Sequence, residues 1–301
     1  MCPRSGATAS GGTRKLYAAA MTRRLLGVFA HPDDESYGPA GTLATSSAAG
    51  VDVHIAVMTD GAAGTPAAGF PEGAALAEVR HRELQAAAAV LNATLHHFAY
   101  RDSGYTGDER NGDPDVFMNI DPAEPMADLV ELIRSVRPDV VITHDENGGY
   151  RHPDHIRCHQ LVRAAFEAAG DPGRYRELGP PFRPARLYSE TTSNRWIKVF
   201  IRILRLLRRD PTRFGVNKDV DLTHVGMDPA RITTRIDVRR GWVPKKAATA
   251  CHASQRGGSG PLGRMPAWLL AVVSPRELFI REHPPPHPGL REDGLFPPPS
   301  G

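Results

Sequence analysis

The chain has 301 residues, of which 41% are hydrophobic and 24% charged, and its formal net charge is +3. This is the composition of an ordinary soluble globular protein, and so small a charge does not favour a nucleic-acid-binding protein. No apolar run approaches the roughly 20 residues that span a bilayer, so we expect no membrane-spanning helix.

The first residues carry no secretory signal. Residues 1–21 are rich in Ser, Gly, Ala and Thr and lack an apolar core segment, so we expect a disordered extension, with translation starting at the first residue or at Met21. The three cysteines, Cys2, Cys158 and Cys251, are odd in number and scattered. We therefore predict no disulfide framework and a cytoplasmic location.

The first half of the chain alternates strand and helix patterns. Apolar, β-prone runs at 25–30, 51–58, 94–99 and 139–143 are separated by Ala- and Leu-rich segments at about 38–49, 74–92 and 123–136. A fourth helix is predicted from Pro153 to Ala169, because proline favours the first helical position, and a fifth strand is predicted at 186–189. Such alternation predicts an α/β fold, with a Rossmann-like, open and mainly parallel sheet that carries helices on both faces.

The second half is less regular. A strand is predicted over 232–238 and a helix over 243–254, and the stretch from His283 is proline-rich and expected to be disordered or extended. We predict a single domain over 22–282, with an irregular C-terminal cap at about 191–256 and a tail at 283–301.

Two short acidic and histidine-containing segments follow strand-like runs. One is Ala30-His31-Pro32-Asp33-Asp34-Glu35-Ser36, and the other is Gly148-Gly149-Tyr150-Arg151-His152-Pro153-Asp154-His155. The carboxyl ends of parallel strands share one edge of the sheet, where ligands bind. We therefore expect the two segments to meet in space.

Together these segments predict a metal site. His31, Asp34 and His155 would supply two imidazoles and a carboxylate, as a catalytic zinc site requires, although such a set also holds Fe²⁺. Asp33 would then face the water on the metal. Aspartates after a strand often only cap the next helix, but the complete string and its second His-Pro-Asp partner favour the metal site.

A rival pair of histidines lies on the fourth helix. His155 and His159 are four residues apart, with Cys158 between them, as in the helix of zinc proteases. That motif needs Glu after the first histidine, where this chain has Ile156. We therefore interpret His159 and Cys158 as packing groups, or as groups that support the ligands without touching the metal.

The two segments resemble those of the PIG-L/LmbE family of metal-dependent N-deacetylases, which includes the deacetylase and the S-conjugate amidase of mycothiol metabolism. The resemblance covers roughly residues 23–256 and implies an LmbE-like fold. It implies the metal ligands His31, Asp34 and His155 and the general base Asp33.

The same resemblance implies further site residues. His152 would assist the leaving amine or the oxyanion, and Tyr150 would polarise the carbonyl. As a mechanistic hypothesis of our own, His152 would be protonated to donate to the amine, and Asp154 could keep an imidazole oriented and charged. Substrate-binding positions are implied at Arg80 and Asp102, and Gly61 would lie in a loop that lines the pocket. The segment 251–255 resembles a late element near the site.

The function implied is zinc-dependent hydrolysis of the N-acetyl group of an N-acetylglucosamine-type sugar conjugate, which gives a free amine and acetate. Two alternatives stay open: an amidase acting on a mycothiol S-conjugate or another amide, and a non-catalytic sugar-binding relative. The expected partner is a small molecule and not a nucleic acid, and the chain could form a homo-oligomer.

Residues 196–209 form a basic amphipathic segment, in which Lys198, Arg202, Arg205 and Arg209 recur at helical spacing. Such a helix can lie in a membrane interface, cover the pocket as a lid, or pack on the core with a solvated basic side. We prefer the last interpretation.

Overall fold

The computed structural model describes residues 22–213, 221–258 and 265–297. The extension predicted at 1–21 lies outside these residues. Among the described helices, none combines the length and the apolar character that crossing a membrane requires.

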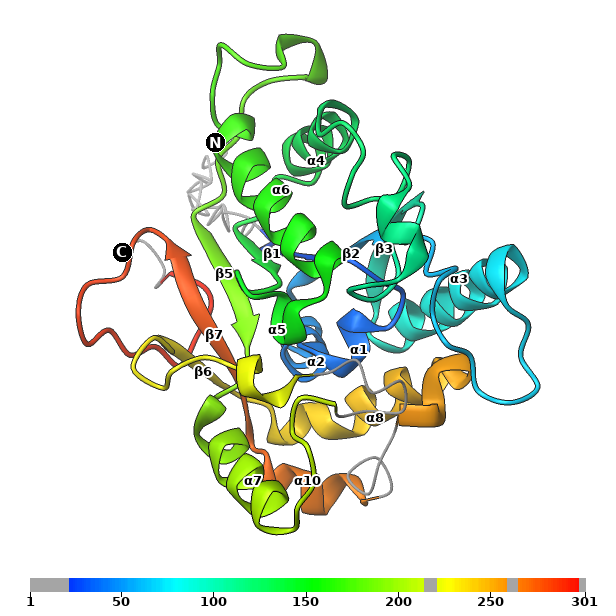
Figure 1. The fold of residues 1–301 in the computed structure, drawn as a ribbon. Helices are drawn as coiled ribbons and strands as arrows, with labels where there is room; N and C mark the ends of the chain where they lie inside the picture. Colours follow the sequence, from blue (N-terminus) through cyan, green and yellow to red (C-terminus); the bar gives the residue numbers. More distant parts are fainter. Residues whose placement is uncertain (1–21, 214–220, 259–264, 298–301) are drawn as a thin grey trace, which may run out of the picture.

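A seven-stranded sheet forms the centre of the molecule (Figure 1). Its strands, in the order β3-β2-β1-β4-β5-β7-β6, are β3 (Ala93–Tyr100), β2 (Asp52–Thr59), β1 (Arg24–Phe29), β4 (Val140–Thr143), β5 (Arg186–Thr191), β7 (Arg276–His283) and β6 (Thr234–Asp237). The first five in this order are parallel to one another, while β7 runs antiparallel to both of its neighbours. The predicted α/β fold with a mainly parallel sheet is therefore confirmed.

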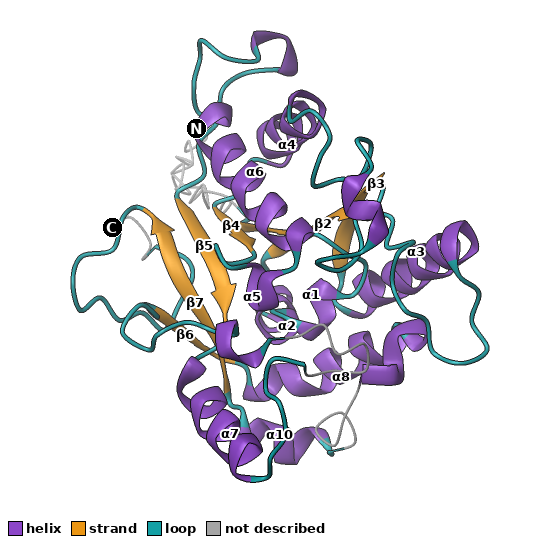
Figure 2. Cartoon of the chain, viewed as in Figure 1, coloured by secondary structure: helices purple, strands orange, loops and turns teal. Residues whose placement is uncertain are grey.

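Helices cover both faces of the sheet (Figure 2). They are α1 (Asp34–Tyr37), α2 (Ala40–Ala48), α3 (Gly73–Val90), α4 (Ala123–Val136), α5 (Gly148–Arg151), α6 (Pro153–Ala169), α7 (Asn194–Leu206), α8 (Trp242–Cys251) and α10 (Ala267–Val273). The predicted start of a helix at Pro153 is confirmed, since proline stands at its first turn.

The side chains of β1 point alternately into two separate hydrophobic cores. Leu26 and Val28 pack with α4 and α6 on one face, whereas Leu25 and Phe29 pack with α2, α3 and α8 on the other. All four side chains are fully buried. Successive side chains of a strand point to opposite faces, so a strand covered on both sides reads as one continuous apolar run.

The C-terminal region differs most from the sequence-based expectation. The sequence analysis assigned no strand to β7, which inserts between β5 and β6 and buries Phe279 completely. The proline-rich tail has no regular element in its described part, yet Leu295 is buried in the same core as Tyr188. Glu292 forms an ion pair with Arg186 at 2.9 Å. The described tail therefore packs against the domain as part of it.

The sheet order also places the two predicted segments side by side. The strand order reverses at β1, which has β2 on one side and β4 on the other. Ligands bind at such a switch point, beyond the carboxyl ends of the strands. The first segment follows β1 and the second follows β4, so both lie at this point.

Candidate metal centre

The first segment forms a tight turn between β1 and α1. Asp33 has φ 142° and ψ −21°, a conformation that a residue with a side chain adopts only when its surroundings enforce it. The carboxylate of Glu35 accepts a hydrogen bond from the Asp33 N–H at 3.0 Å and lies 2.7 Å from His252 Nε2. Glu35 is fully buried and supports the turn.

The second segment forms a loop between β4 and α6. Gly148 has φ 61°, and a Cβ there would lie 2.9 Å from the side chain of Ile156, so only glycine lets this loop lie against α6. His152 caps α6, since its Nδ1 accepts a hydrogen bond from the Asp154 N–H at 3.3 Å.

His31, Asp34 and His155 lie together at the switch point. His31 Nδ1 is 3.1 Å from His155 Nε2 and 3.5 Å from Asp34 Oδ2, and His155 Nε2 is 3.4 Å from Asp34 Oδ1. Ligand atoms 2.0–2.2 Å from a tetrahedral zinc ion are about 3.3–3.6 Å apart. The three separations lie near this range, with the two contacts of Asp34 made by different carboxylate oxygens. Two imidazoles and a carboxylate are a donor set that suits Zn²⁺ or Fe²⁺.

The Asp33 carboxylate contacts Arg80 beside this cluster. Its Oδ2 lies 3.1 Å from Arg80 Nη2. Burial raises the pKa of Asp33 to about 6, although the Arg80 guanidinium opposes the rise. A carboxylate with this pKa is suited to accept a proton near neutral pH.

Two proton-bearing rings lie beside the cluster. The His152 ring is 4.5 Å from the His31 ring, and the Tyr150 ring is 5.5 Å from the His155 ring, between centroids. Burial raises the pKa of Tyr150, so its hydroxyl remains a donor.

Burial, followed by the imidazoles of His31 and His155, lowers the pKa of His152 well below its ordinary value. The protonated form expected of His152 is therefore disfavoured in this buried site. Because its Nδ1 accepts a hydrogen bond from the backbone, the neutral ring carries its proton on Nε2.

The Asp154 carboxylate contacts the imidazole of His31, which belongs to the other motif segment. Its Oδ2 lies 3.3 Å from His31 Nε2 and accepts a hydrogen bond from the Ser103 N–H at 2.9 Å. A carboxylate on the outer nitrogen of a histidine fixes the ring for metal binding. Asp154 therefore orients His31.

The three expected substrate-binding positions also lie at the site, but protein groups already engage them. Arg80 donates to the carbonyl of Gly61 at 2.9 Å and to that of Pro32 at 2.7 Å. A Cβ on Gly61 would lie 2.7 Å from the guanidinium, so glycine makes room for Arg80. Asp102 accepts from the Gly104 N–H at 2.9 Å. Burial alone would raise the pKa of Asp102, but the His31 imidazole and this hydrogen bond lower it.

The sequence analysis missed His144. It follows β4, and its Nε2 lies 3.4 Å from Asp34 Oδ2 and accepts from the Ala30 N–H at 2.9 Å. Its Nδ1 lies 3.3 Å from Glu190 Oε1, at the end of β5. The position of His144 directly after a predicted strand could have indicated a site residue. The contact between His144 and Glu190 could not be predicted in this way, because it depends on the order of the strands in the sheet.

His159 and Cys158 are buried packing groups, as expected. His159 Nδ1 donates to the carbonyl of His144 at 2.8 Å, and Cys158 is fully buried. Among the described residues, three groups of side chains could hold a metal ion, because one nitrogen or oxygen atom of each member lies within 4.8 Å of the others. They are His31, His152 and His155; Asp34, His144 and His155; and His31, Asp102 and Asp154. None of these groups includes His159 or Cys158, and none contains His31, Asp34 and His155 together. Each takes at least two of its members from the two motif segments.

Cavities open on two sides of the cluster. A small one of about 80 Å³ is lined by Asp33, Arg80, Asp102 and Tyr150. A larger one of about 610 Å³ is lined by residues of β5, β7 and α8, and Asp34 and Tyr150 border both. Asp34 and Tyr150 are therefore accessible from both cavities.

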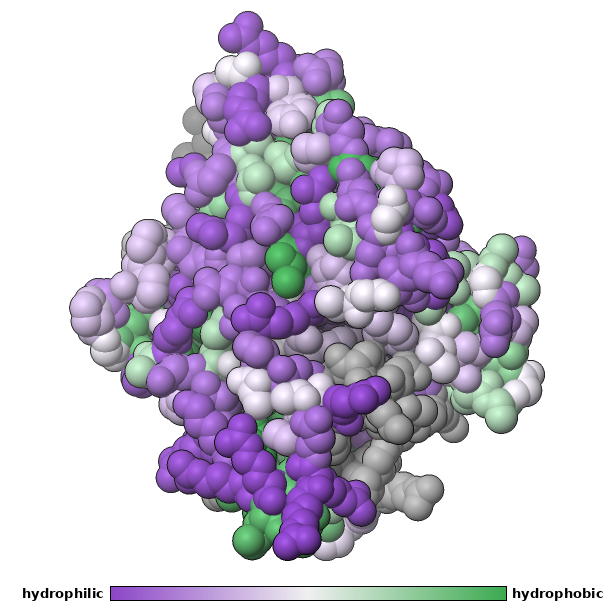
Figure 3. All heavy atoms as spheres, viewed as in Figure 1, coloured by the Kyte–Doolittle hydropathy of each residue, from purple (hydrophilic) through white to green (hydrophobic). Residues whose placement is uncertain are grey.

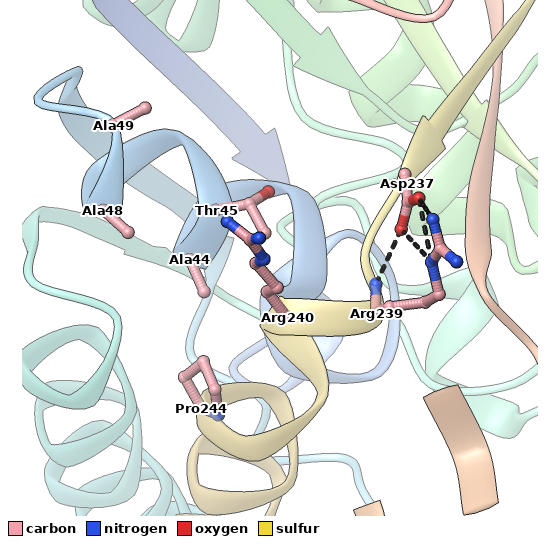
Figure 4. A pocket seen from close by; sticks show the side chains of 8 residues that line it. All are labelled: Ala44, Thr45, Ala48, Ala49, Asp237, Arg239, Arg240 and Pro244. Carbon is pink, nitrogen blue, oxygen red and sulfur yellow. Dashed lines mark hydrogen bonds and ion pairs between the residues drawn. The ribbon is translucent and has the colours of Figure 1, made fainter. Parts of the chain in front are cut away.

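A further cavity of about 870 Å³ lies elsewhere, between α2 and the connection from β6 to α8 (Figure 4). It is lined by alanines together with Arg239 and Arg240, and Arg239 pairs with Asp237. None of the predicted site residues lines it, so its size does not make it the active site.

Known proteins resemble this chain in sequence. The PIG-L family, described as GlcNAc-PI de-N-acetylase, matches residues 26–166. A 1D-myo-inositol 2-acetamido-2-deoxy-alpha-D-glucopyranoside deacetylase of Thermobispora bispora is 38% identical over 246 residues, which are 77% of this chain and 79% of the relative. The protein of the same name from Thermobifida fusca is 33% identical and aligns over 87% of this chain and 94% of the relative.

Solved structures resemble the fold. The N,N'-diacetylchitobiose deacetylase of Pyrococcus horikoshii superposes with a TM-score of 0.60 at 20% identity, covering 87% of this chain and 84% of that one. The 4-carboxy-2-hydroxymuconate hydratase of Pseudomonas putida KT2440 superposes with a TM-score of 0.59 at 19% identity, covering 89% and 100%. Since a hydratase shares the fold, the fold alone does not define the reaction. The sequence matches, over most of both chains, establish that this protein belongs to the PIG-L family of deacetylases.

Proposed function

We propose that this protein hydrolyses the N-acetyl group of 1D-myo-inositol 2-acetamido-2-deoxy-α-D-glucopyranoside or a closely similar N-acetylglucosaminyl sugar, releasing acetate and the free amine. The relatives that carry this name are 33–38% identical to the chain over most of their length. The observation that carries the proposal is the placement of His31, Asp34 and His155 within 3.5 Å of one another, with Asp33 paired to Arg80 beside them.

His31, Asp34 and His155 would hold the divalent cation, zinc or iron(II). When bound, such an ion lowers the pKa of water to about 7 and polarises a carbonyl oxygen. Asp154 keeps the outer nitrogen of His31 engaged, and this leaves Nδ1 directed toward His155.

Asp33 would accept the proton of the attacking water and pass it to the departing nitrogen. Its raised pKa suits both steps. Arg80 restrains this carboxylate through an ion pair at 3.1 Å. Removal of a general base typically slows an enzyme by about 10²–10⁴-fold.

Tyr150 and His152 would stabilise the negative oxygen that develops from the amide carbonyl. Both rings carry a proton at neutral pH, and both lie beside the three ligands. Donors held in place before the reaction are most effective where charge develops. Arg80 and Asp102, which line the smaller cavity, would contact the hydroxyl groups of the sugar. Gly61 would support this contact, because its carbonyl accepts a hydrogen bond from Arg80.

The test is an amine-release and acetate-release assay on protein reconstituted with Zn²⁺ or with Fe²⁺, with metal content measured on the same samples. The substrates are the inositol sugar, N-acetylglucosamine, N,N'-diacetylchitobiose and an amide of a thiol conjugate. We expect the highest kcat/KM for the inositol sugar.

Two results would contradict the proposal. Faster turnover of the thiol-conjugate amide would indicate the amidase alternative. Protein with one metal ion per chain that cleaves none of the four compounds would indicate a non-catalytic relative.

A further inference from the structure

The cap helix α7 carries three parallel stripes of side chains. Residues four and then three apart lie on one face of a helix. The first stripe is Ile197, Ile201 and Leu204, the second is Lys198, Arg202 and Arg205, and the third is Val199, Ile203 and Leu206.

The first stripe packs α7 onto the protein. Ile201 and Leu204 are 8% and 7% exposed, and they form a small core with Leu222. This explains why the helix is ordered, and it agrees with the preferred interpretation of a packed cap helix. It does not explain the third stripe.

The third stripe is apolar and faces outward. Val199, Ile203 and Leu206 are 38%, 48% and 84% exposed, and Leu207, which follows the helix, is 62% exposed. Isolated exposed aliphatic residues are ordinary on soluble proteins, but a contiguous stripe marks an interaction surface.

The second stripe is basic and lies between the other two. Lys198, Arg202 and Arg205 are exposed, and within residues 22–213, 221–258 and 265–297 none of them pairs with an acidic side chain. Figure 3 shows hydrophilic and hydrophobic side chains adjoining at the lower end of the molecule, where α7 lies.

A second helix near α7, beyond the predicted cap region, also exposes apolar side chains. In α10, Trp268, Val272 and Val273 are 69%, 70% and 57% exposed. This helix and α7 both lie at the lower end of the molecule in Figure 1. Thr192, just before α7, and Ser274, just after α10, line the cavity of about 610 Å³ that reaches Asp34.

We propose that α7 docks this protein on the surface of an anionic lipid bilayer. The stripe of Val199, Ile203 and Leu206 would enter the boundary between headgroups and acyl chains, and Lys198, Arg202 and Arg205 would contact lipid phosphates. A helix that lies in a membrane interface combines an apolar stripe with adjoining basic residues in this way. A protein partner would need acidic groups matched in position to this stripe, whereas an anionic membrane presents them everywhere.

The test is flotation of the full-length chain with two kinds of vesicle. One kind is phosphatidylcholine alone, and the other contains about 30 mol% phosphatidylglycerol, which gives a clear negative surface potential. We expect binding to the anionic vesicles at low salt, a reduction at high salt because surface charges are screened, and little binding to the neutral vesicles.

Two pairs of variants separate the contributions. Arg202→Glu with Arg205→Glu should reduce partition by more than about tenfold, since each basic side chain contributes roughly fivefold at an anionic surface. Its matched control is Arg82→Glu with Arg176→Glu, an equal change of charge at positions elsewhere on the surface, which should retain most binding. Ile203→Ser with Leu206→Ser should also lose binding, while Val90→Ser, at a 40% exposed apolar position, should not.

Three outcomes would overturn the inference. The wild-type chain could fail to float with anionic vesicles at low salt. The two control variants could lose as much binding as the α7 variants. Sedimentation could show that the wild type is a dimer and that the double variant Ile203→Ser with Leu206→Ser is a monomer. If neither protein bound vesicles, the apolar stripe would be a contact with a second copy of the chain. Deacetylation of a water-soluble substrate, measured in parallel, tests the proposed function separately.

Discussion

Asp33 and Asp34 are adjacent in the chain, yet their carboxylates face different partners. Asp34 Oδ1 lies 3.4 Å from His155 Nε2, whereas Asp33 Oδ2 lies 3.1 Å from Arg80 Nη2. Asp33 has an unusual backbone conformation at this point, with φ 142°. Two neighbouring acids can thereby take different parts in one reaction.

Separate substitutions of Asp33 and Asp34 should distinguish the roles of the two carboxylates. Asp33→Asn should bind metal normally and lose about 10²–10⁴-fold in kcat, while Asp34→Ala should lose the metal, because a ligand is gone. Metal content per chain and kcat are measured on the same samples. Asp52→Asn, at an exposed position on β2, is the control and should resemble the wild type. Full metal content in Asp34→Ala would contradict the ligand assignment.

The buried pair of Glu35 and His252 should be important for stability. Both side chains are 0% exposed and 2.7 Å apart, so Glu35→Ala leaves a buried imidazole without its partner. Removing one member of a buried pair typically costs about 3–5 kcal/mol, measurable as the free energy of unfolding in urea. The exposed pair of Glu146 and Arg231, 2.6 Å apart, provides the comparison, since Glu146→Ala should cost less than about 1 kcal/mol. Equal losses in the two variants would show that Glu35 does not support the turn.

A pair of histidines should make stability sensitive to acid. His97 donates through Nε2 to the Thr59 carbonyl at 2.8 Å, and its Nδ1 lies 2.7 Å from His81 Nδ1. Burial, and also the neighbouring His81, lowers the pKa of His97. The unfolded chain therefore binds a proton more readily than the folded one, and this contribution to stability is lost as the pH falls below about 6.5.

Urea unfolding at pH 7.5 and pH 5.5 tests this sign. His97→Gln should show a smaller loss of unfolding free energy between the two pH values than the wild type. His287→Gln, at an exposed position in the tail, should show the wild-type loss. A larger loss in His97→Gln would mean that the folded protein favours the charged form of His97.

The proline-rich tail should contribute to the stability of the domain. Leu295 is 3% exposed and packs in the core that contains Tyr188 and Phe279. Leu295→Ala should lower the free energy of unfolding by about 2–5 kcal/mol, as buried leucines do. Leu290→Ala, at a less buried position of the same tail, should cost clearly less. A negligible effect of Leu295→Ala would support the predicted boundary of the domain at residue 282.

The sequence by itself determined the strand–helix alternation, the fold class and the two segments that meet at the switch point. These features are local: an apolar run, a proline at the start of a helix or a His-Pro-Asp string is visible within a few residues. The strand–helix alternation also predicts that His31 and His155 lie close together, because parallel strands align their carboxyl ends at one edge of the sheet.

Only the tertiary structure decided the contacts that depend on which distant segments become neighbours. The pairing of Glu35 with His252 spans 217 residues, and that of His144 with Glu190 requires β4 and β5 to be adjacent. Contacts between distant segments also place β7 between β5 and β6 and bury Leu295 in the core. Burial over the whole chain selects these neighbours, and no short stretch of sequence contains that information.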